Sequence, residues 1–202
     1  MKKLTDSQIK FFVKPATFLL CLLPFAFLVV GAINDGLGVN PVETLTHETG
    51  QWALKFLLIT LFITPLRRLT KAHWLIKIRR MLGLYAFFYA VLHFIIYIWL
   101  DQFFEWLEIL ADIPKRPFIT IGFVSFLLLI PLAITSTNAM QRRLKKEWLK
   151  LHKLVYVIPM LVIVHFLWSL KADYSEPMIY TFVFLALMIM RFFHDKKKAS
   201  KS

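Results

Sequence analysis

One run of twenty almost wholly apolar residues, Met81–Leu100, constrains this chain most. At the α-helical rise, twenty residues extend for about 30 Å, which is the thickness of the hydrocarbon core of a bilayer. His93 lies near the middle of the run. Because an unsatisfied polar group in lipid is costly, an imidazole at that depth needs a partner. The run therefore predicts a transmembrane helix with a polar site inside it.

Five further apolar runs are separated by short polar or basic segments. We predict six spans, at about residues 11–33, 51–65, 81–100, 118–134, 151–170 and 178–193. The hydrophobic share of 58% exceeds that of an ordinary soluble domain. The first run is too long for the apolar part of a signal peptide and has no clear cleavage site, so we interpret it as a retained anchor.

The predicted fold class is therefore all-α, an integral membrane bundle of six transmembrane helices that forms one domain over residues 1–202. We expect a loop at residues 34–50, ahead of the second span. No convincing internal repeat is evident in the sequence. The single cysteine, Cys21, excludes an intrachain disulfide, and no C-x-x-C-H motif for covalent haem attachment occurs.

The basic residues predict the orientation. With the N-terminus inside, nineteen Lys and Arg residues face the cytoplasm and only three lie in the outer loops. The positive-inside rule therefore places both termini in the cytoplasm. The formal net charge of +13 is compatible with nucleic-acid binding, but the basic residues lie in short loops beside apolar segments and not on a soluble domain. We reject that class of function.

Two histidines are predicted to reach the same depth. His93 lies twelve residues into the third span and His165 fourteen residues into the fifth, which are about 18 and 21 Å along helices of the same direction. Two imidazoles on opposite helices are the arrangement that bis-histidine haem ligation requires. Small residues along the third span are expected to make room for the ring: Gly83, Ala86 and Ala90. The alternative is that each histidine only hydrogen-bonds a neighbouring helix.

A second haem site nearer the cytoplasm is a weaker possibility. His152 precedes His165 by thirteen residues, or about 20 Å of helix. Thirteen residues turn an ideal helix by about 220°, so the two side chains share a face only if Pro159 distorts it. The third span offers Arg79 and Arg80 at the inner level and no histidine. The three remaining histidines are interpreted as solvated or interfacial: His47, His73 and His194.

Arg79 and Arg80 admit two interpretations. Paired arginines at an inner interface commonly contact lipid phosphates or act as topology signals. They also suit bidentate binding of a phosphate or a propionate. The sequence leaves both open.

Four acidic residues follow the third span at positions i, i+4, i+7 and i+11. They are Asp101, Glu105, Glu108 and Asp112, with aromatic and leucine residues between them. The pattern predicts an amphipathic helix on the membrane surface with one acidic face. That face is a candidate docking surface for a partner, or simply its solvated side.

Four segments are familiar as motifs. They are GQWALKFLLITLFITPLRR (50–68), IRRMLGLYAFFYAVLH (78–93), TSTNAMQRRLKKEWLKLHKLVY (135–156) and HFLWSLK (165–171). On these, almost the whole chain resembles the MsrQ family, formerly called YedZ, the haem-binding membrane subunits of periplasmic protein-methionine-sulfoxide reductase systems. The wider superfamily is the ferric-reductase-like transmembrane domain, which NADPH oxidases share. Those relatives carry two histidines on each of two helices, and this chain keeps three of the four.

The resemblance implies the cofactors. It implies a b-type haem on His93 and His165, and a place for His152 in or near a second haem site. It also implies an FMN at the cytoplasmic side, with Arg79 and Arg80 as its phosphate-binding pair.

The resemblance also implies an electron-transfer subunit of the bacterial inner (cytoplasmic) membrane. Electrons would come from the quinone pool or from a cytoplasmic flavin reductase. They would pass to a periplasmic molybdopterin methionine sulfoxide reductase catalytic subunit, the partner in a heterodimer that repairs oxidised periplasmic proteins. Two rivals stay open from the residues alone: a stand-alone ferric or quinone reductase, and a non-redox transporter or membrane scaffold.

Overall fold

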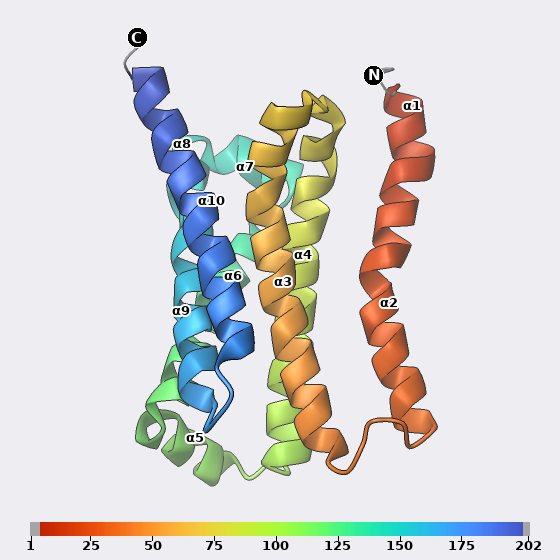
Figure 1. Cartoon of the computed structure of the whole chain (residues 1–202), viewed down its shortest axis with the longest axis vertical. Coiled ribbons are helices and arrows are strands. Elements are labelled where there is room, and N and C mark those ends of the chain that lie inside the picture. Colours follow the sequence, from red (N-terminus) through yellow and green to blue (C-terminus); the bar gives the residue numbers. More distant parts are fainter. Residues whose placement is uncertain (1–4, 200–202) are drawn as a thin grey trace.

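The computed structural model describes residues 5–199, and over these the chain is a bundle of helices without strands. The helices are α1 (Asp6–Gln8), α2 (Lys14–Ile33), α3 (Pro41–Thr70), α4 (Ile76–Ile96), α5 (Trp106–Lys115), α6 (Pro117–Ile134), α7 (Asn138–Leu144), α8 (Lys146–Leu151), α9 (Leu154–Ser169) and α10 (Ser175–Ala199). Six helical segments in this part of the chain are long and apolar enough to cross a membrane, which confirms the predicted fold class. Both described ends of the chain lie at the same end of the bundle (Figure 1).

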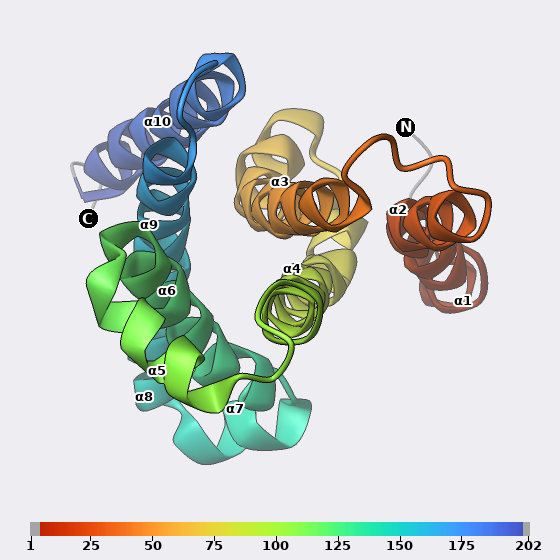
Figure 2. The same cartoon turned by 90° about the horizontal axis from the view of Figure 1, so that it is seen from below.

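The long helices form two neighbouring pairs. Helices α3 and α4 pack along each other, as do α6 and α9, while α2 and α10 stand on opposite flanks (Figures 1 and 2). The short helix α5 covers the end of the bundle away from the termini, and α7 and α8 lie at the other end. The two pairs therefore face each other across the interior of the bundle.

Helix α3 is much longer than the predicted second span, and the expected loop at residues 34–50 is helical from Pro41 onward. The Asn40 side chain accepts a hydrogen bond from the backbone N–H of Glu43 at 3.3 Å, and Pro41 occupies the first turn, where its missing N–H costs nothing. The Asn, Pro and acidic residues that suggested a loop instead form the start of a helix. Thr46 and Gly50 therefore lie within helix α3 and not in a loop.

The acidic row does not lie on one helix face as predicted. Asp101 ends a π-helical turn that extends α4, and the chain then reverses through Phe103 and Phe104. Both have positive φ values, 45° and 61°, which interrupt a helix. Helix α5 begins only after Glu105.

Asp112 turns inward instead of joining an exposed acidic surface. Its carboxylate accepts hydrogen bonds from the Tyr97 hydroxyl, at 3.0 Å, and from the Arg116 guanidinium. The Asp112 side chain is only 19% exposed. The hydrogen bond from Arg116 holds the pKa of Asp112 below its usual value. This ion pair fixes α5 against the start of α6.

The basic connection after α6 folds as two short helices. The Thr137 side chain accepts from the backbone N–H of Met140 at 3.1 Å, so Thr137 is the N-cap of α7. Lys145, at a φ of 47°, separates α7 from α8.

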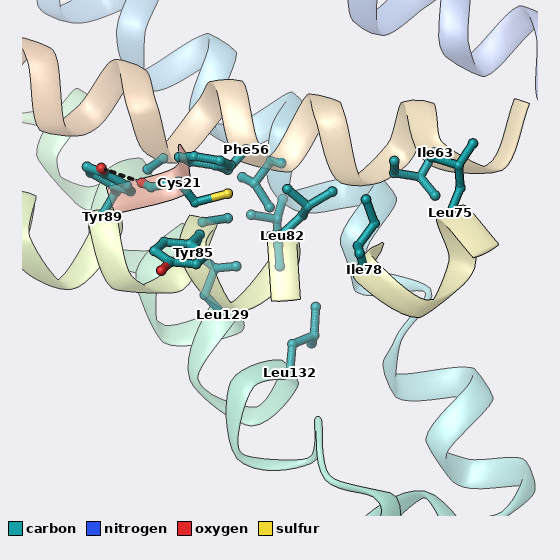
Figure 3. Packing of buried hydrophobic residues seen from close by; sticks show 14 residues of the cluster. Cys21, Phe56, Ile63, Leu75, Ile78, Leu82, Tyr85, Tyr89, Leu129 and Leu132 are labelled. Atoms are coloured by element: carbon teal, nitrogen blue, oxygen red, sulfur yellow. Dashed lines mark hydrogen bonds between the residues drawn. The ribbon is translucent and has the colours of Figure 1, made fainter. Parts of the chain in front are cut away.

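A buried aromatic cluster joins α2, α3 and α4 (Figure 3). Tyr89 is 0% exposed at its centre and stacks on Phe56 with ring centroids 5.4 Å apart. Tyr85 lies one turn earlier and donates to the Phe18 carbonyl at 2.8 Å. The cluster attaches the outlying helix α2 to the pair α3 and α4.

The Tyr89 hydroxyl is inserted into the backbone of α2. It donates to the Cys21 carbonyl at 2.9 Å and accepts from the Phe25 N–H at 3.0 Å. In a regular helix these two backbone groups would bond each other. Pro24 lies inside this turn, where helices commonly bend. Because the surroundings are apolar, the inserted hydroxyl is what satisfies both groups.

We expect Tyr89→Phe to destabilise the protein by about 1–3 kcal/mol, because two buried backbone groups lose their partner. Thermal unfolding in detergent measures the effect. Tyr174→Phe is the matched control, since Tyr174 is 49% exposed. Equal melting temperatures for the two variants would contradict the role given to Tyr89.

Candidate functional site

The structure brings His93 of α4 and His165 of α9 together. Their ring centroids are 6.2 Å apart and their planes are inclined at 81°. Both rings line a cavity of about 770 Å³ between α3, α4, α6 and α9. The matched depth that the sequence predicted is therefore a direct juxtaposition.

Each ring is held by a backbone carbonyl of the neighbouring helix. His93 Nδ1 lies 2.9 Å from the Thr46 oxygen, and His165 Nδ1 lies 2.6 Å from the Phe118 oxygen. Because a carbonyl only accepts, both Nδ1 atoms carry the hydrogen and donate. Nε2 is then the nitrogen with the lone pair, and no described residue hydrogen-bonds it on either ring. Metal-binding histidines are typically oriented in this way.

Two glycines allow the rings to lie against the helices. A Cβ at Gly122 would be 2.8 Å from Cε1 and Nδ1 of His165, and one at Gly50 would be 3.1 Å from the same atoms of His93. At Gly122 a larger residue would force the imidazole to move, and at Gly50 it would require a shift of a few tenths of an ångström. The glycines therefore give the imidazoles access to the carbonyl one turn earlier on the same helix.

Only one of the three small residues predicted to make room for the haem ring lines the cavity. Ala90 lines the cavity, but Ala86 is buried in the aromatic cluster and Gly83 faces Thr60 on α3. Gly50 and Gly122 were not among the small residues predicted from the sequence. Their signal was present, because each glycine precedes its histidine by 43 residues.

The two helix pairs repeat the same construction. In both, the histidine follows its acceptor carbonyl by 47 residues. The pair α3 and α4 is thus the counterpart of α6 and α9 at this site, although no convincing repeat is evident in the sequence. The spacing in sequence that relates His93 to His165 also relates Arg80 to His152, so Arg80 is the counterpart of His152.

The pair fits the axial ligation of a haem. Imidazole nitrogens bind first-row metals at about 2 Å, so two rings on opposite sides of one ion have centroids about 6 Å apart. The observed 6.2 Å agrees. Among the described residues no group of three or more His, Cys, Asp or Glu side chains is placed to hold a metal. Two protein ligands suit an ion whose remaining ligands come from a macrocycle.

The cavity walls suit an apolar ring with polar substituents. Phe94, Phe123 and Phe126 contribute aromatic surface. Two of the three basic residues predicted for the outer loops, Arg116 and Lys171, also line it. The Arg116 Nε is buried and has no partner among the described residues, which leaves a donor for a ligand carboxylate.

His152 lies apart from this cavity. Thr135 donates its hydroxyl hydrogen to the Pro131 carbonyl at 2.6 Å, so its oxygen accepts from His152 Nε2, 3.0 Å away. The His152 ring also stacks on Trp148 with centroids 3.9 Å apart. The structure therefore engages His152 in protein contacts and does not pair it with another histidine.

Arg79 and Arg80 lie near the start of α4, close enough to His152 for their charges to act on it. Arg80 donates to the Asn138 side-chain oxygen at 2.6 Å and to Gln141 at 3.4 Å, which connects α4 to α7. Arg79 is half-buried. The two arginines are thus at the end of the bundle that holds the termini, away from His93 and His165.

His47 is not a loop residue as expected. It lies in α3, lines the same cavity as the paired histidines, and its ring is 6.4 Å from that of Phe166.

Comparison with known proteins shows which family this chain resembles. Residues 49–164 match the family described as the ferric reductase like transmembrane component, a match that ends one residue before His165. The chain is similar to the protein-methionine-sulfoxide reductase heme-binding subunit MsrQ of Herminiimonas arsenicoxydans, with 51% identity over 94% of this chain and 88% of the relative. For the subunit of the same name from Ralstonia nicotianae the identity is 51% over 89% and 84%. For that of Xanthomonas campestris pv. campestris it is 54% over 77% and 71%. No solved structure matches the chain.

We expect Gly122→Ala to displace the His165 ring at a cost of about 1–3 kcal/mol, because the added methyl group overpacks the contact. Gly50→Ala should act in the same direction but less strongly, since its contact is longer. Titration of the purified protein with ferric haem, followed by absorbance, measures the loss of affinity.

Gly83→Ala is the control for this pair, because its Cβ would meet nothing closer than 3.8 Å. Alanine also favours a helix over glycine by about 0.5–1 kcal/mol, so this variant should be as stable as the wild type or more so. Haem binding by Gly122→Ala equal to that of Gly83→Ala would show that the glycine contact is not needed.

Proposed function

Because this chain belongs to the ferric-reductase-like transmembrane family and, within it, to the haem-binding MsrQ subunits of protein-methionine-sulfoxide reductase, we propose that it carries electrons across a membrane to a methionine sulfoxide reductase. The observation that carries the proposal is the pairing of His93 and His165 in one cavity. The finer proposal is a path from the quinone pool or a cytoplasmic flavin reductase, through FMN and a b-type haem, to a periplasmic molybdopterin subunit.

A haem bound here supplies a one-electron redox couple inside the membrane. His93 and His165 would bind its iron from two sides through Nε2. The carbonyls of Thr46 and Phe118 hold both rings in the right tautomer and raise their basicity as ligands. With two histidines to hold it, the haem would supply electron transfer and no binding position for a substrate. That arrangement favours an electron carrier over an enzyme that reacts at the iron.

One haem is the arrangement we propose. His152 has its Nε2 hydrogen-bonded to Thr135, and its counterpart on the other helix pair is Arg80. A cationic side chain suits an anionic ligand and not a metal ion. We therefore propose that the inner level, around Arg79 and Arg80, holds the FMN phosphate, with lipid contact as the alternative.

The proposed direction of transfer follows from charge. The end of the bundle with both termini carries most of the Lys and Arg, so it is assigned to the cytoplasm and to the electron donor. The haem cavity reaches toward the opposite end, where Asp101, Phe103 and Ile113 of α5 are among its lining residues. The reductase partner would dock there and accept the electron on the periplasmic side of a bacterial inner membrane.

We expect His93→Ala and His165→Ala each to abolish the b-type absorption spectrum of the purified protein, because a single imidazole leaves one axial position empty. His152→Ala is the matched control and should keep one haem per chain. The measurement is haem content together with an optical redox titration. A colourless wild-type protein would remove the haem proposal, and loss of half the haem in His152→Ala would indicate two haems.

We expect the double substitution of Arg79 and Arg80 by alanine to release FMN from the purified protein, because the phosphate loses its cationic partners. Arg142 and Arg143, replaced together on α7 at the same end, are the control for loss of positive charge. Flavin fluorescence after denaturation measures the FMN that each variant retains. Equal FMN content in both double variants would assign Arg79 and Arg80 to lipid contact instead.

A further inference from the structure

A second pocket lies between α3, α9 and α10, at the end of the bundle with both termini. Its volume is about 190 Å³, roughly a quarter of the haem cavity. On α3 it begins at Leu61, one helical turn beyond Leu57 of the haem cavity, so the two cavities are neighbours and not one space. Neither the family nor the proposed electron path assigns it a ligand.

The pocket is cationic. Arg68, Arg191 and His194 line it, and none of its described lining residues is acidic. Arg68 makes no hydrogen bond or ion pair with a described residue. Arg191 lies over the Tyr156 ring, 4.1 Å from its centroid, and donates to the Tyr156 hydroxyl. These contacts hold the guanidinium at the pocket wall. The chemistry of the lining therefore favours an anion.

Thr64 supplies a second, independent observation. Its hydroxyl oxygen is buried, lines the pocket and has no partner among the described residues. Thr46 and Thr70 of the same helix donate to the carbonyl four residues earlier at 2.8 Å. The Thr60 hydroxyl also has no partner among the described residues, but Thr60 does not line the pocket. A buried hydroxyl without a partner in an apolar bundle is costly. A ligand oxygen in the pocket would satisfy it.

The remaining wall is apolar and reaches the outer surface of the bundle. Leu69 is 70% exposed and Met190 40% exposed, on the outer surface of the bundle. The pocket thus combines a small cationic recess with an apolar flank. This is the chemistry that recognises an amphipathic molecule with a phosphate headgroup and an acyl chain.

We propose that this pocket binds the phosphate of an anionic phospholipid, held by Arg68, Arg191 and Thr64. The recess is small enough for a headgroup, while the acyl chains would lie along the exposed side of α10. Bound in this way, the lipid would bridge α10 to α3 beside the buried cluster in which Leu61 and Leu187 already join the two helices. The site is independent of the proposed electron path.

The test compares lipid binding by the purified full-length protein in detergent. Phosphatidylglycerol should raise the melting temperature of the wild type, and phosphatidylcholine should not. Arg68→Gln should weaken phosphatidylglycerol binding by about tenfold or more, as expected for loss of a hydrogen bond to a charged group. Thr64→Val, which has a similar shape, should act in the same direction. Arg142→Gln, on exposed α7, is the matched control and should bind like the wild type.

Two further arms separate the sources of phosphate. Inorganic phosphate and FMN are titrated against the same variants, and native mass spectrometry reports the lipid that each variant retains. Arg68-dependent binding of either soluble ligand, tighter than that of phosphatidylglycerol, overturns the lipid assignment. Equal stabilisation by phosphatidylcholine, or equal lipid retention by Arg68→Gln and Arg142→Gln, overturns the site. Unchanged helical circular dichroism in Arg68→Gln confirms that the variant is folded.

Discussion

Two hydrogen bonds from an imidazole to a backbone carbonyl organise the centre of this protein. In a helix those carbonyls already accept from the N–H four residues later, so an extra donor must approach from the side. Glycine at positions 50 and 122 removes the side chains that would block that approach. The result is a pair of rings whose Nδ1 atoms are engaged and whose Nε2 atoms are presented to one cavity. Every proposal about the haem depends on this contact.

The apolar surroundings explain why side chains hydrogen-bond the backbone of a neighbouring helix elsewhere in the bundle as well. Tyr89 satisfies an opened turn of α2, and Tyr85 donates to a second carbonyl of the same helix. Polar groups at this depth cannot rely on water, so side chains from a neighbouring helix complete the backbone. Helix α2 is thereby attached to α4 through hydroxyl groups as well as through apolar packing. Where no protein partner exists, as at Thr64, the same reasoning points to a ligand.

The two helix pairs are equivalent at the outer level and different at the inner one. His93 and His165 correspond, with the same spacing to glycine and to the acceptor carbonyl. At the inner level His152 corresponds to Arg80, and each is bound to other residues of the connection between α6 and α9. A pair of like groups can share a metal ion, whereas a histidine and an arginine cannot. The two levels therefore differ in the chemistry they offer: two imidazoles at the outer level, and an imidazole and a guanidinium at the inner one.

The sequence by itself determined the six spans, the site of the two histidines at one depth and the charge difference between the ends, because hydropathy and helical rise fix these one helix at a time. It misjudged the start of α3 and the direction of Asp112, where a cap and an ion pair outweigh composition. It also missed Gly50 and Gly122, because their role exists only once another helix lies against them. Which faces of the helices meet was decided by tertiary packing alone. That packing joined His93 to His165, separated His152 from both, and gave the arginines their different surroundings.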